Sequence, residues 1–324
     1  MTDPMHSQAT YRALCESETD IPLFLQAWWL DATCGAESWD VVLVEKGGQV
    51  HAALPYRMSR RQGFRVLSQP PLTPFLGPWL RDTGAKTANS YSRQKDLMTE
   101  LIAQLPAFDH YQQNWSPRIT NWLPFYWQGF KQSTRYTYAI NELGEENALW
   151  GRLRENIRTD IRKARNRFRL TVDADAALDE FLRLNDLVFS RQGRTRPYAD
   201  AYVSRIDAEC SARACRRIFI ARDDEGRAHA GVYLVWDKRS AHYLLGGGDP
   251  ELRNSGATSL CMWEAIRFAA TVTKRFDFEG SMIEPIERFF RAFGADQVPY
   301  FEVSKTPSRL LAGLMSARTL VRGA

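Results

Sequence analysis

Apolar residues in the second half of the chain follow helical spacing first and strand spacing next. Leu178, Phe181, Leu184 and Val188 recur every three or four positions, which places them on one face of a predicted helix. Three β-rich runs between residues 216 and 248 are separated by DDEG and DKRS. This arrangement predicts an antiparallel meander that follows the helix.

The spacing changes again after Gly248. Apolar residues in 260–270 and in 284–294 have helical spacing, whereas 274–280 and 298–305 alternate as strands do. The second half is therefore predicted to run helix, three-stranded meander, helix, strand, helix and strand.

The first half shows the same order in a looser form. A helical pattern at 21–35 precedes a hairpin pattern at 39–59 and a further helix at 94–105. The segment FDHYQ…GFKQSTRYTYAI then aligns with FDFEG…FGADQVPYFEVS of the second half. Repeated order of this kind indicates a duplicated domain.

The repeat predicts two domains, which cover residues 1–150 and 151–324. The second begins with a basic helix at 151–169 and ends in a short C-terminal tail. Its eight lysines and arginines face two acids, Glu155 and Asp160. This helix is either a solvated linker face or a set of guanidinium groups, Arg158 and Arg162 among them, that bind a phosphate-bearing ligand.

Composition narrows the class of protein. The 324 residues are 44% hydrophobic and carry a formal net charge of +5, which is too weakly basic for a dedicated nucleic-acid binder. Five cysteines without a CxxC pair and five histidines without HExxH predict neither disulfides nor a metal site. With no apolar leader and no membrane-length apolar run, the expected location is the cytoplasm.

Five segments, taken in order, resemble one known family. They are FLGPWLRD, GFKQSTRYTYAINEL, LRENIRTDIRKARNRF, SGATSL and FDFEGSMIEPIERFFRAFGA. Together they resemble the GNAT acyltransferase superfamily, and within it the tandem-domain branch of the Fem aminoacyl transferases and their acetyltransferase-like relatives. The resemblance implies an α/β (α+β) fold of two tandem GNAT-like domains, each a central mixed β-sheet flanked by helices.

The resemblance also implies transfer of an acyl group to an amine, but it leaves the donor open. Fem enzymes use aminoacyl-tRNA, whereas other GNAT proteins use acyl-CoA. The chain departs from the Fem pattern in two respects. Phe290 occupies the position of the lysine in the family's FKxxFG motif, with Arg291 beside it, and no paired-helix arm for tRNA is evident.

The segment GGGDPELRNSGATSL (246–260) is the predicted site for the donor's pyrophosphate. Arg253 and Gly256 fit the usual GNAT coenzyme A motif, and Thr258 departs from it. Free N–H groups at a helix start bind anions, and glycine permits close approach. The predicted binding residues are Arg253, Asn254, Ser255, Gly256, Ala257 and Thr258. The alternative is a polar turn in which Asn254 or Ser255 caps the helix.

Acyl transfer to an amine needs a proton acceptor and donors for the developing oxyanion. Glu279 is the predicted base, because it leaves the strand opposite the phenylalanine face. Asp277 shares that side and is predicted to orient Glu279 or to bind the amine. Tyr243 and Ser281 are candidate proton donors. Ordinary packing, loop contacts and solvation are the alternatives for all four.

Further residues are candidates for binding the acceptor. Arg191, Arg194 and Arg196 occupy a predicted loop, where they either bind an acidic group or are solvated. Trp79 and Trp115 either stack on a sugar or nucleotide or pack in a core. The tail stripe that includes Leu310 and Leu314 is expected to dock on its own domain, with a membrane-surface helix as the alternative.

The sequence therefore predicts an N-acyltransferase that takes its acyl group from acyl-CoA. The predicted partner is a small-molecule amine, such as an anionic or sugar-linked intermediate of envelope, polysaccharide or specialised metabolism, without stable insertion in a membrane. The alternatives are an aminoacyl-tRNA-dependent transferase and a non-catalytic binding protein on the same fold.

Overall fold

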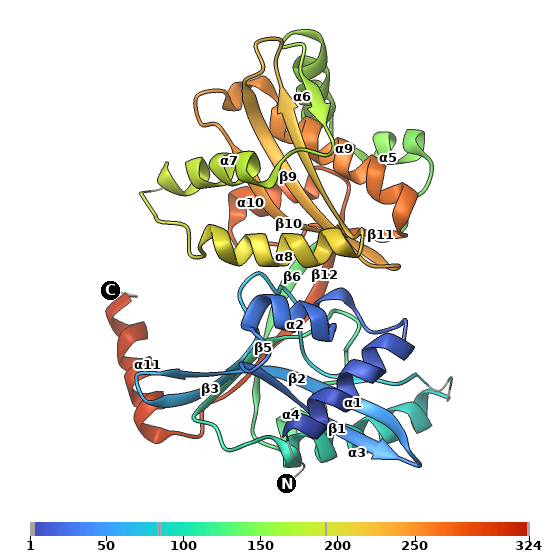
Figure 1. Ribbon diagram of the computed structural model, residues 1–324, viewed down its shortest axis with the longest axis vertical. Helices are drawn as coiled ribbons and strands as arrows, with labels where there is room; N and C mark the ends of the chain where they lie inside the picture. The colour runs from blue at the N-terminus through green and yellow to red at the C-terminus, as the bar shows by residue number, and fades with distance from the viewer. Residues whose placement is uncertain (1–3, 83, 85, 192, 323–324) are drawn as a thin grey trace. The chain divides into compact units, whose positions relative to one another are not determined.

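The computed structural model describes residues 4–82, 84, 86–191 and 193–322 (Figure 1). The chain forms two compact units, of which unit 1 is Met1–Arg135 with Pro299–Ala324 and unit 2 is Tyr136–Val298. This division differs from the predicted boundary at residue 150. The chain passes from one unit to the other within strand β6 (Lys131–Ile140) and returns within β12 (Asp296–Lys305), so strands rather than a linker join the units.

Unit 1 contains a mixed sheet with strand order β1-β2-β3-β5-β12. Neighbours are antiparallel except for β3 and β5, and β4 pairs with β2. The strands are β1 (Trp39–Lys46), β2 (Gln49–Arg61), β3 (Phe64–Ser68), β4 (Trp79–Leu80) and β5 (His110–Asn114). The helical elements are α1 (Pro4–Ser17), η1 (Leu23–Leu25), α2 (Ala27–Cys34), α3 (Thr87–Gln104), α4 (Leu123–Trp127) and α11 (Arg309–Arg322).

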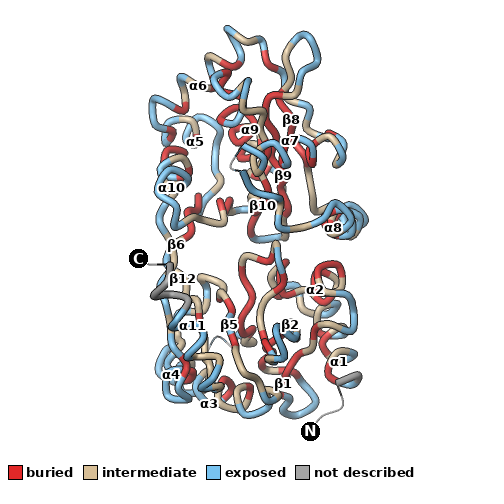
Figure 2. Tube along the Cα trace, turned by 90° about the vertical axis from the view of Figure 1, so that its left-hand side faces the viewer, coloured by how far each residue is buried: buried red, intermediate tan, exposed pale blue. Residues whose placement is uncertain are grey.

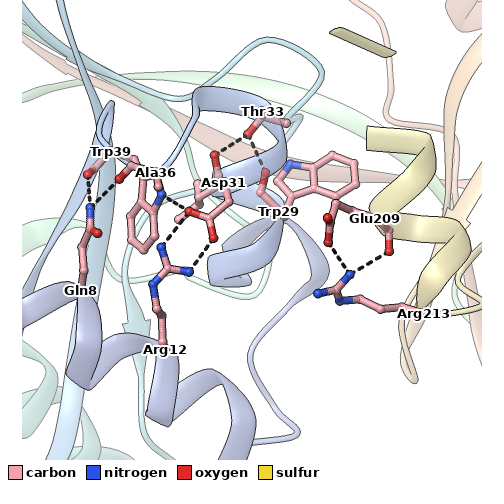
Figure 3. A network of polar contacts seen from close by, with 10 residues as sticks. Gln8, Arg12, Trp29, Asp31, Thr33, Ala36, Trp39, Glu209 and Arg213 are labelled. Carbon is pink, nitrogen blue, oxygen red and sulfur yellow. Dashed lines mark hydrogen bonds and ion pairs between the residues drawn. The ribbon is translucent and has the colours of Figure 1, made fainter. Parts of the chain in front are cut away.

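A polar cluster joins α1, α2 and β1 in unit 1 (Figure 3). The Arg12 guanidinium donates to both carboxylate oxygens of Asp31 at 2.5 and 2.8 Å, and the indole N–H of Trp39 donates to the same carboxylate at 2.9 Å. A bidentate pair of this kind fixes the orientation of both side chains. The cluster therefore sets how the two helices meet the first strand.

Unit 2 contains a mixed sheet with strand order β6-β11-β10-β9-β8-β7. Its further strands are β7 (Thr171–Asp173), β8 (Arg216–Arg222), β9 (Ala228–Trp236), β10 (Ser240–Gly248) and β11 (Arg275–Asp277). The helical elements are α5 (Glu146–Arg152), α6 (Glu155–Asn166), α7 (Leu178–Ser190), α8 (Asp200–Ala212), η2 (Arg253–Ser255), α9 (Ala257–Val272) and α10 (Glu284–Arg291). The order predicted from residue 178 onward is confirmed, although α8 is an additional helix.

Helices cover both faces of the β8-β9-β10 meander. Along β9 the side chains alternate: Val232 and Leu234 belong to the core that α9 completes, whereas Tyr233 packs against Phe181 of α7. Buried residues accordingly follow β9 and β10 (Figure 2). The mixed sheet with helices on both faces agrees with the predicted fold class.

Among the described residues, no helix is long and apolar enough to cross a membrane.

Candidate active site

Strands β10 and β11 separate at the centre of unit 2. They pair in parallel from Ser240 and Arg275 to His242 and Asp277, where β11 ends. Strand β10 continues six residues further, to Gly248, and keeps its pairing with β9 on the other edge. Because β11 no longer covers the near edge, the backbone of β10 can donate hydrogen bonds to a ligand there.

The open part of β10 is irregular. Its register with β9 shifts between Tyr243 and Leu245, which is the mark of a β-bulge. A Cβ on Gly246, beyond the bulge, would lie 1.8 Å from the Tyr243 hydroxyl, so a larger residue there would have to displace the Tyr243 side chain. The buried Asn185 amide of α7 donates to the Gly246 carbonyl at 2.6 Å and holds this segment.

The loop after β10 forms a pocket with it. A cavity of 240 Å³ is lined by Tyr243, Gly246–Gly248 and Arg253, and by Ala257 and Thr258 at the start of α9. Helix α9 is 16 residues long, and the first amides of a helix have no intrahelical acceptor. This cavity, the β10–α9 pocket, therefore combines an exposed arginine with the positive end of a helix.

Gly256, rather than a polar side chain, occupies the N-cap of α9. Its φ is +82°, and a Cβ there would lie 2.3 Å from the backbone oxygen of Asp160 on α6. The alternative of an Asn254 or Ser255 cap is therefore wrong. Ser255 is buried and its hydroxyl accepts the Ala257 amide, while Asn254 is exposed and lies outside the pocket lining.

Glu279 leaves the end of β11 in an unusual backbone conformation. Its φ is +59°, and the following Gly280 has φ +60°. A Cβ at Gly280 would lie 2.2 Å from the Tyr136 carbonyl oxygen, so this position requires glycine. Left-handed conformation at a non-glycine residue costs about 1 kcal/mol or more, and it persists where surrounding contacts impose it.

Asp277 supplies the contacts that hold this turn. Its Oδ1 accepts the Glu279 amide at 2.8 Å and the Thr137 hydroxyl at 2.5 Å, and its Oδ2 lies 2.9 Å from the Arg275 guanidinium. The Asp277 side chain is fully buried. It is therefore committed to structural contacts, which favours the orienting role over direct binding of the amine.

The two carboxylates have opposite surroundings. The Oε1 atom of Glu279 is buried and has no hydrogen-bond partner among the described residues. Burial raises the pKa of Glu279 well above its ordinary value, and the charge of Asp277 raises it further. A carboxylate with a raised pKa and free lone pairs is suited to accept a proton.

Tyr243 lies at the same opening. Burial raises the pKa of its phenol, and the charge of Glu279 raises it further, so the hydroxyl remains protonated at neutral pH. Its ring packs edge-on against Phe290 of α10, with 5.8 Å between centroids. The departure from the Fem motif at Phe290 thus has a packing role in this chain, and Arg291 pairs with Glu287.

The other predicted residues lie in different surroundings. Arg191 lines the β10–α9 pocket, whereas Arg194 and Arg196 line a separate hollow. The Arg196 guanidinium is almost fully buried and pairs with Asp186 at 3.2 Å and with Asp200, so it fixes its own loop. The Ser281 hydroxyl accepts the Ile283 amide in the turn before α10.

Neither tryptophan has a face available for stacking of the kind predicted. Trp115 is 0% exposed and packs edge-on against Phe125 at 4.7 Å, so the prediction that it binds a sugar is wrong. Trp79 is 7% exposed and borders a 320 Å³ pocket of unit 1, with the Arg81 guanidinium 5.3 Å above its ring. Core packing, the alternative, accounts for Trp115.

The arginines of α6 are largely paired within the chain. Arg158 and Arg162 both contact Glu155, at 2.9 and 3.1 Å, and Arg162 also lies over the Trp150 ring. Ile157 and Ile161 on the opposite face are buried. Together with the contact between Asp160 and Gly256, this gives α6 a structural role behind the pocket loop.

Asn185 and the glycines of β10 were not among the predicted site residues. In the sequence, helical spacing indicated only that this part of α7 packs against a core. The structure shows in addition that Asn185 contacts Gly246. The run of three glycines in the sequence indicated only a turn. Among the described residues, no three His, Cys, Asp or Glu side chains converge as metal ligands.

Comparison with known proteins shows a domain match in the second half of the chain and a shared fold over the whole chain. Residues 151–285 match the model of the acetyltransferase (GNAT) domain. The fold of the whole chain is similar to that of FemX, with a TM-score of 0.63, 13% identity and coverage of 91% of this chain and 95% of that one. A search of curated proteins finds no match.

Two further structures share the fold. One is the C-terminal domain assigned to a lysylphosphatidylglycerol synthetase of Agrobacterium fabrum (TM-score 0.56, 14% identity, coverage of 97% and 98%). The other is L-PGS of Bacillus licheniformis (TM-score 0.53, 10% identity, coverage of 97% and 95%). Residues 151–285 thus match a GNAT acetyltransferase domain, and the fold of the whole chain is similar to that of these structures.

Proposed function

We propose that the chain is an N-acyltransferase that takes an acyl group from acyl-CoA and transfers it to an amine in unit 2. The observation that carries this proposal is the opening between β10 and β11, with a buried, unpartnered carboxylate oxygen on one strand and an arginine-bearing pocket beside the other. One side of the opening suits a phosphate-bearing donor, and the other suits proton transfer.

The pocket supports a pyrophosphate-bearing donor by its chemistry. Arg253 offers a guanidinium, and the start of α9 offers amide donors and a partial positive charge. Arg191 borders the same pocket and supplies a second cation.

The reaction can be written with the chain's own residues. Glu279 removes a proton from the acceptor ammonium, and the free amine nitrogen attacks the thioester carbonyl. Amides on the open edge of β10 stabilise the oxyanion. As the new C–N bond forms and the C–S bond breaks, the Tyr243 hydroxyl donates its proton to the leaving thiolate. The excess proton of the amide nitrogen passes to solvent, and transfer of a proton from Glu279 to the Tyr243 phenolate restores both side chains.

Aminoacyl-tRNA is the second candidate donor, and the fold shared with FemX is the reason to test it. The basic residues of α6 would have to contact the RNA, yet Arg158, Arg162 and Arg165 are already paired with Glu155 and Glu264. An RNA donor predicts a steep loss of affinity with added salt. A coenzyme A donor predicts a much shallower dependence.

The test is release of free thiol from acetyl-CoA in the presence of a panel of primary amines, including amino sugars and amino acids. The expected result is amine-dependent thiol release that Glu279→Gln abolishes. Glu302→Gln is the matched control, because Glu302 pairs with Arg135 in unit 1 and is not among the residues that line the pocket. Acyl transfer from aminoacyl-tRNA but not from acetyl-CoA would replace the proposed donor.

A further inference from the structure

Two cysteines meet at the C-terminal end of α8 in unit 2. The helix ends at Ala212, and Ala214 has a φ of +50°. The Cys215 amide donates to the Cys210 carbonyl at 2.9 Å. Inside this bond, the Ala214 amide donates to the Ser211 carbonyl at 3.0 Å. Two such bonds around a left-handed residue define a Schellman motif, in which the side chains of the outer pair frequently come into contact.

The outer pair of this motif, Cys210 and Cys215, has the spacing that a disulfide needs. The 2.9 Å bond between their backbones keeps the two Cα atoms within about 6.8 Å of each other. Disulfides join Cα atoms that are roughly 4.4 to 6.8 Å apart. The two side chains also converge, because their thiols share a hydrogen bond. Four residues separate the two cysteines, so no CxxC motif marks the pair in the sequence.

The two thiols differ in access and in acidity. Cys210 is fully buried, whereas Cys215 is partly exposed, and both are free. The hydrogen bond from the Cys210 thiol lowers the pKa of Cys215 despite its burial, and the charge of Arg213 adds to the effect. Arg213 also pairs with Glu209 at 2.6 Å (Figure 3). Since the thiolate is the nucleophile, Cys215 is the member of the pair that attacks an oxidant.

The other three cysteines lie in different surroundings. Burial raises the pKa of Cys15 and of Cys34 to about 11. It raises the pKa of Cys261 to about 12, and that thiol donates to the Ala230 carbonyl at 3.4 Å. All five cysteines are described, and Cys215 alone has a lowered pKa. Reactivity toward an oxidant should therefore concentrate at the end of α8.

We propose that Cys210 and Cys215 form a redox modification site, which hydrogen peroxide oxidises to a reversible disulfide. The Cys215 thiolate attacks one peroxide oxygen, the O–O bond breaks, and the leaving hydroxide takes up a proton to become water. The Cys210 thiol then attacks the sulfenic sulfur of Cys215, and a second water leaves as the S–S bond forms. Two thiols thus lose two electrons and two protons to one peroxide. A dithiol reductant restores both thiols by exchange.

The surrounding contacts hold the pair in place before oxidation. Cys215 directly precedes β8, and its carbonyl accepts the Trp236 amide of β9 at 3.0 Å. The Asp207 carboxylate of α8 accepts the Tyr233 hydroxyl of β9 at 2.8 Å. Both ends of the new bond are therefore anchored to the meander, and the disulfide would fasten the last turn of α8 to it. The proposal is independent of the acyl transfer proposed for unit 2.

The test is treatment of the reduced full chain with hydrogen peroxide, alkylation of the remaining thiols in urea, and mass spectrometry of a tryptic digest. Trypsin cleaves after Arg213, so a disulfide joins peptides 206–213 and 214–216, and reduction separates them. We expect this linked pair to form about tenfold or more faster than Cys34 is oxidised. Cys34→Ala is the matched control, because Cys34 is also partly exposed, and it should form the linked pair at the wild-type rate.

Two variants separate the roles of the pair. Cys210→Ala removes the second thiol, so Cys215 should accumulate as a sulfenic acid that dimedone traps. Cys215→Ala removes the attacking thiol, so Cys210 should remain reduced after treatment. Thermal unfolding of each variant shows whether it is folded, and the wild-type digest decides the proposal without them.

Three outcomes would overturn the proposal. The first is absence of the linked peptides from the oxidised wild type. The second is oxidation of Cys34 as fast as that of the pair, which would mean that peroxide attacks the thiols of the chain without selection. The third is a dimedone adduct on Cys210 in folded Cys215→Ala, formed as fast as the adduct on Cys215 in Cys210→Ala.

Discussion

Asp277 accepts the backbone amide of Glu279 through its Oδ1 atom at 2.8 Å. This bond spans the turn in which Glu279 has a φ of +59°. The two carboxylates stand two residues apart, yet one is satisfied by three partners and the other has a buried oxygen with none among the described residues. We therefore assign positioning to Asp277 and proton transfer to Glu279.

Asp277→Asn separates these two roles. The amide can still accept the Glu279 N–H, but the negative charge that raises the pKa of Glu279 is lost. We expect kcat to fall while KM for the donor changes little. We also expect the acidic limb of the kcat pH profile to move to lower pH, because Glu279 would deprotonate more readily.

Asp277→Ala tests the structural part of the same role. It removes the carboxylate that pairs with the Arg275 guanidinium, and we expect the free energy of unfolding to fall by about 3 kcal/mol. Urea denaturation measures this loss. An unchanged pH profile in the Asn variant, together with normal stability in the Ala variant, would contradict the assignment.

Glu279→Gln should lose activity and gain stability at neutral and higher pH. The raised pKa of Glu279 means that the folded state holds a proton which the unfolded state releases at lower pH. Wild-type stability should therefore decline as pH rises from the ordinary glutamate pKa toward the raised value. The glutamine variant has no proton to release, so it should lack this decline.

Urea midpoints of both proteins, measured from about pH 4 to about pH 9, give the comparison. Turnover of the variant should fall by about a hundredfold to ten-thousandfold. Identical pH slopes for the two proteins would show that Glu279 titrates normally and does not act as the proposed base.

Gly256→Ala should lower the free energy of unfolding by more than the cost of placing alanine at a positive φ. The new methyl group would lie 2.3 Å from the Asp160 oxygen, so either the loop or α6 must move. Gly63→Ala is the control, because Gly63 has φ +85° and open space around its Cβ position. We expect the control to cost about 1 kcal/mol of unfolding free energy and Gly256→Ala to cost about 3 kcal/mol.

Donor affinity provides the second measurement on this pair. Gly256→Ala should weaken acetyl-CoA binding, and Gly63→Ala should leave it unchanged. Equal stability losses in the two variants would mean that the loop does not need its contact with α6.

Tyr243→Phe removes the proposed proton donor and keeps the ring against Phe290. We expect kcat to fall about tenfold to a hundredfold, with little change in KM or in thermal unfolding. Acyl donors with more acidic thiol leaving groups should reduce the defect, because they need less protonation. A defect that is independent of the leaving group would contradict this role.

The sequence predicted much of unit 2, because its elements have strong local signals. Apolar spacing located α7, α9 and α10, and turn residues separated the three strands of the meander. The domain boundary was harder to place. Strands β6 and β12 each belong to both units, and no change in composition marks residue 135.

Local pattern determines the position of only some of the candidate site residues. Asp277 alternates with Phe276 along β11, so its orientation could be read from the sequence, whereas the left-handed turn at Glu279 could not. The Trp115 prediction failed because burial depends on distant parts of the chain, such as Phe301, whose carbonyl accepts the Trp115 amide. The need for glycine at position 256 could not be predicted either. It arises from close contact with α6, almost a hundred residues earlier in the chain, whereas the sequence analysis considered only residues next to the helix start.

The most direct test of the central claim is calorimetric titration of acetyl-CoA and of free coenzyme A into the full chain. The account predicts saturable binding of both ligands, strongly weakened in Arg253→Ala and unchanged in Arg61→Ala, an exposed arginine of unit 1. Absence of binding by either ligand, or equal binding by the wild type and Arg253→Ala, would contradict a donor site in the β10–α9 pocket.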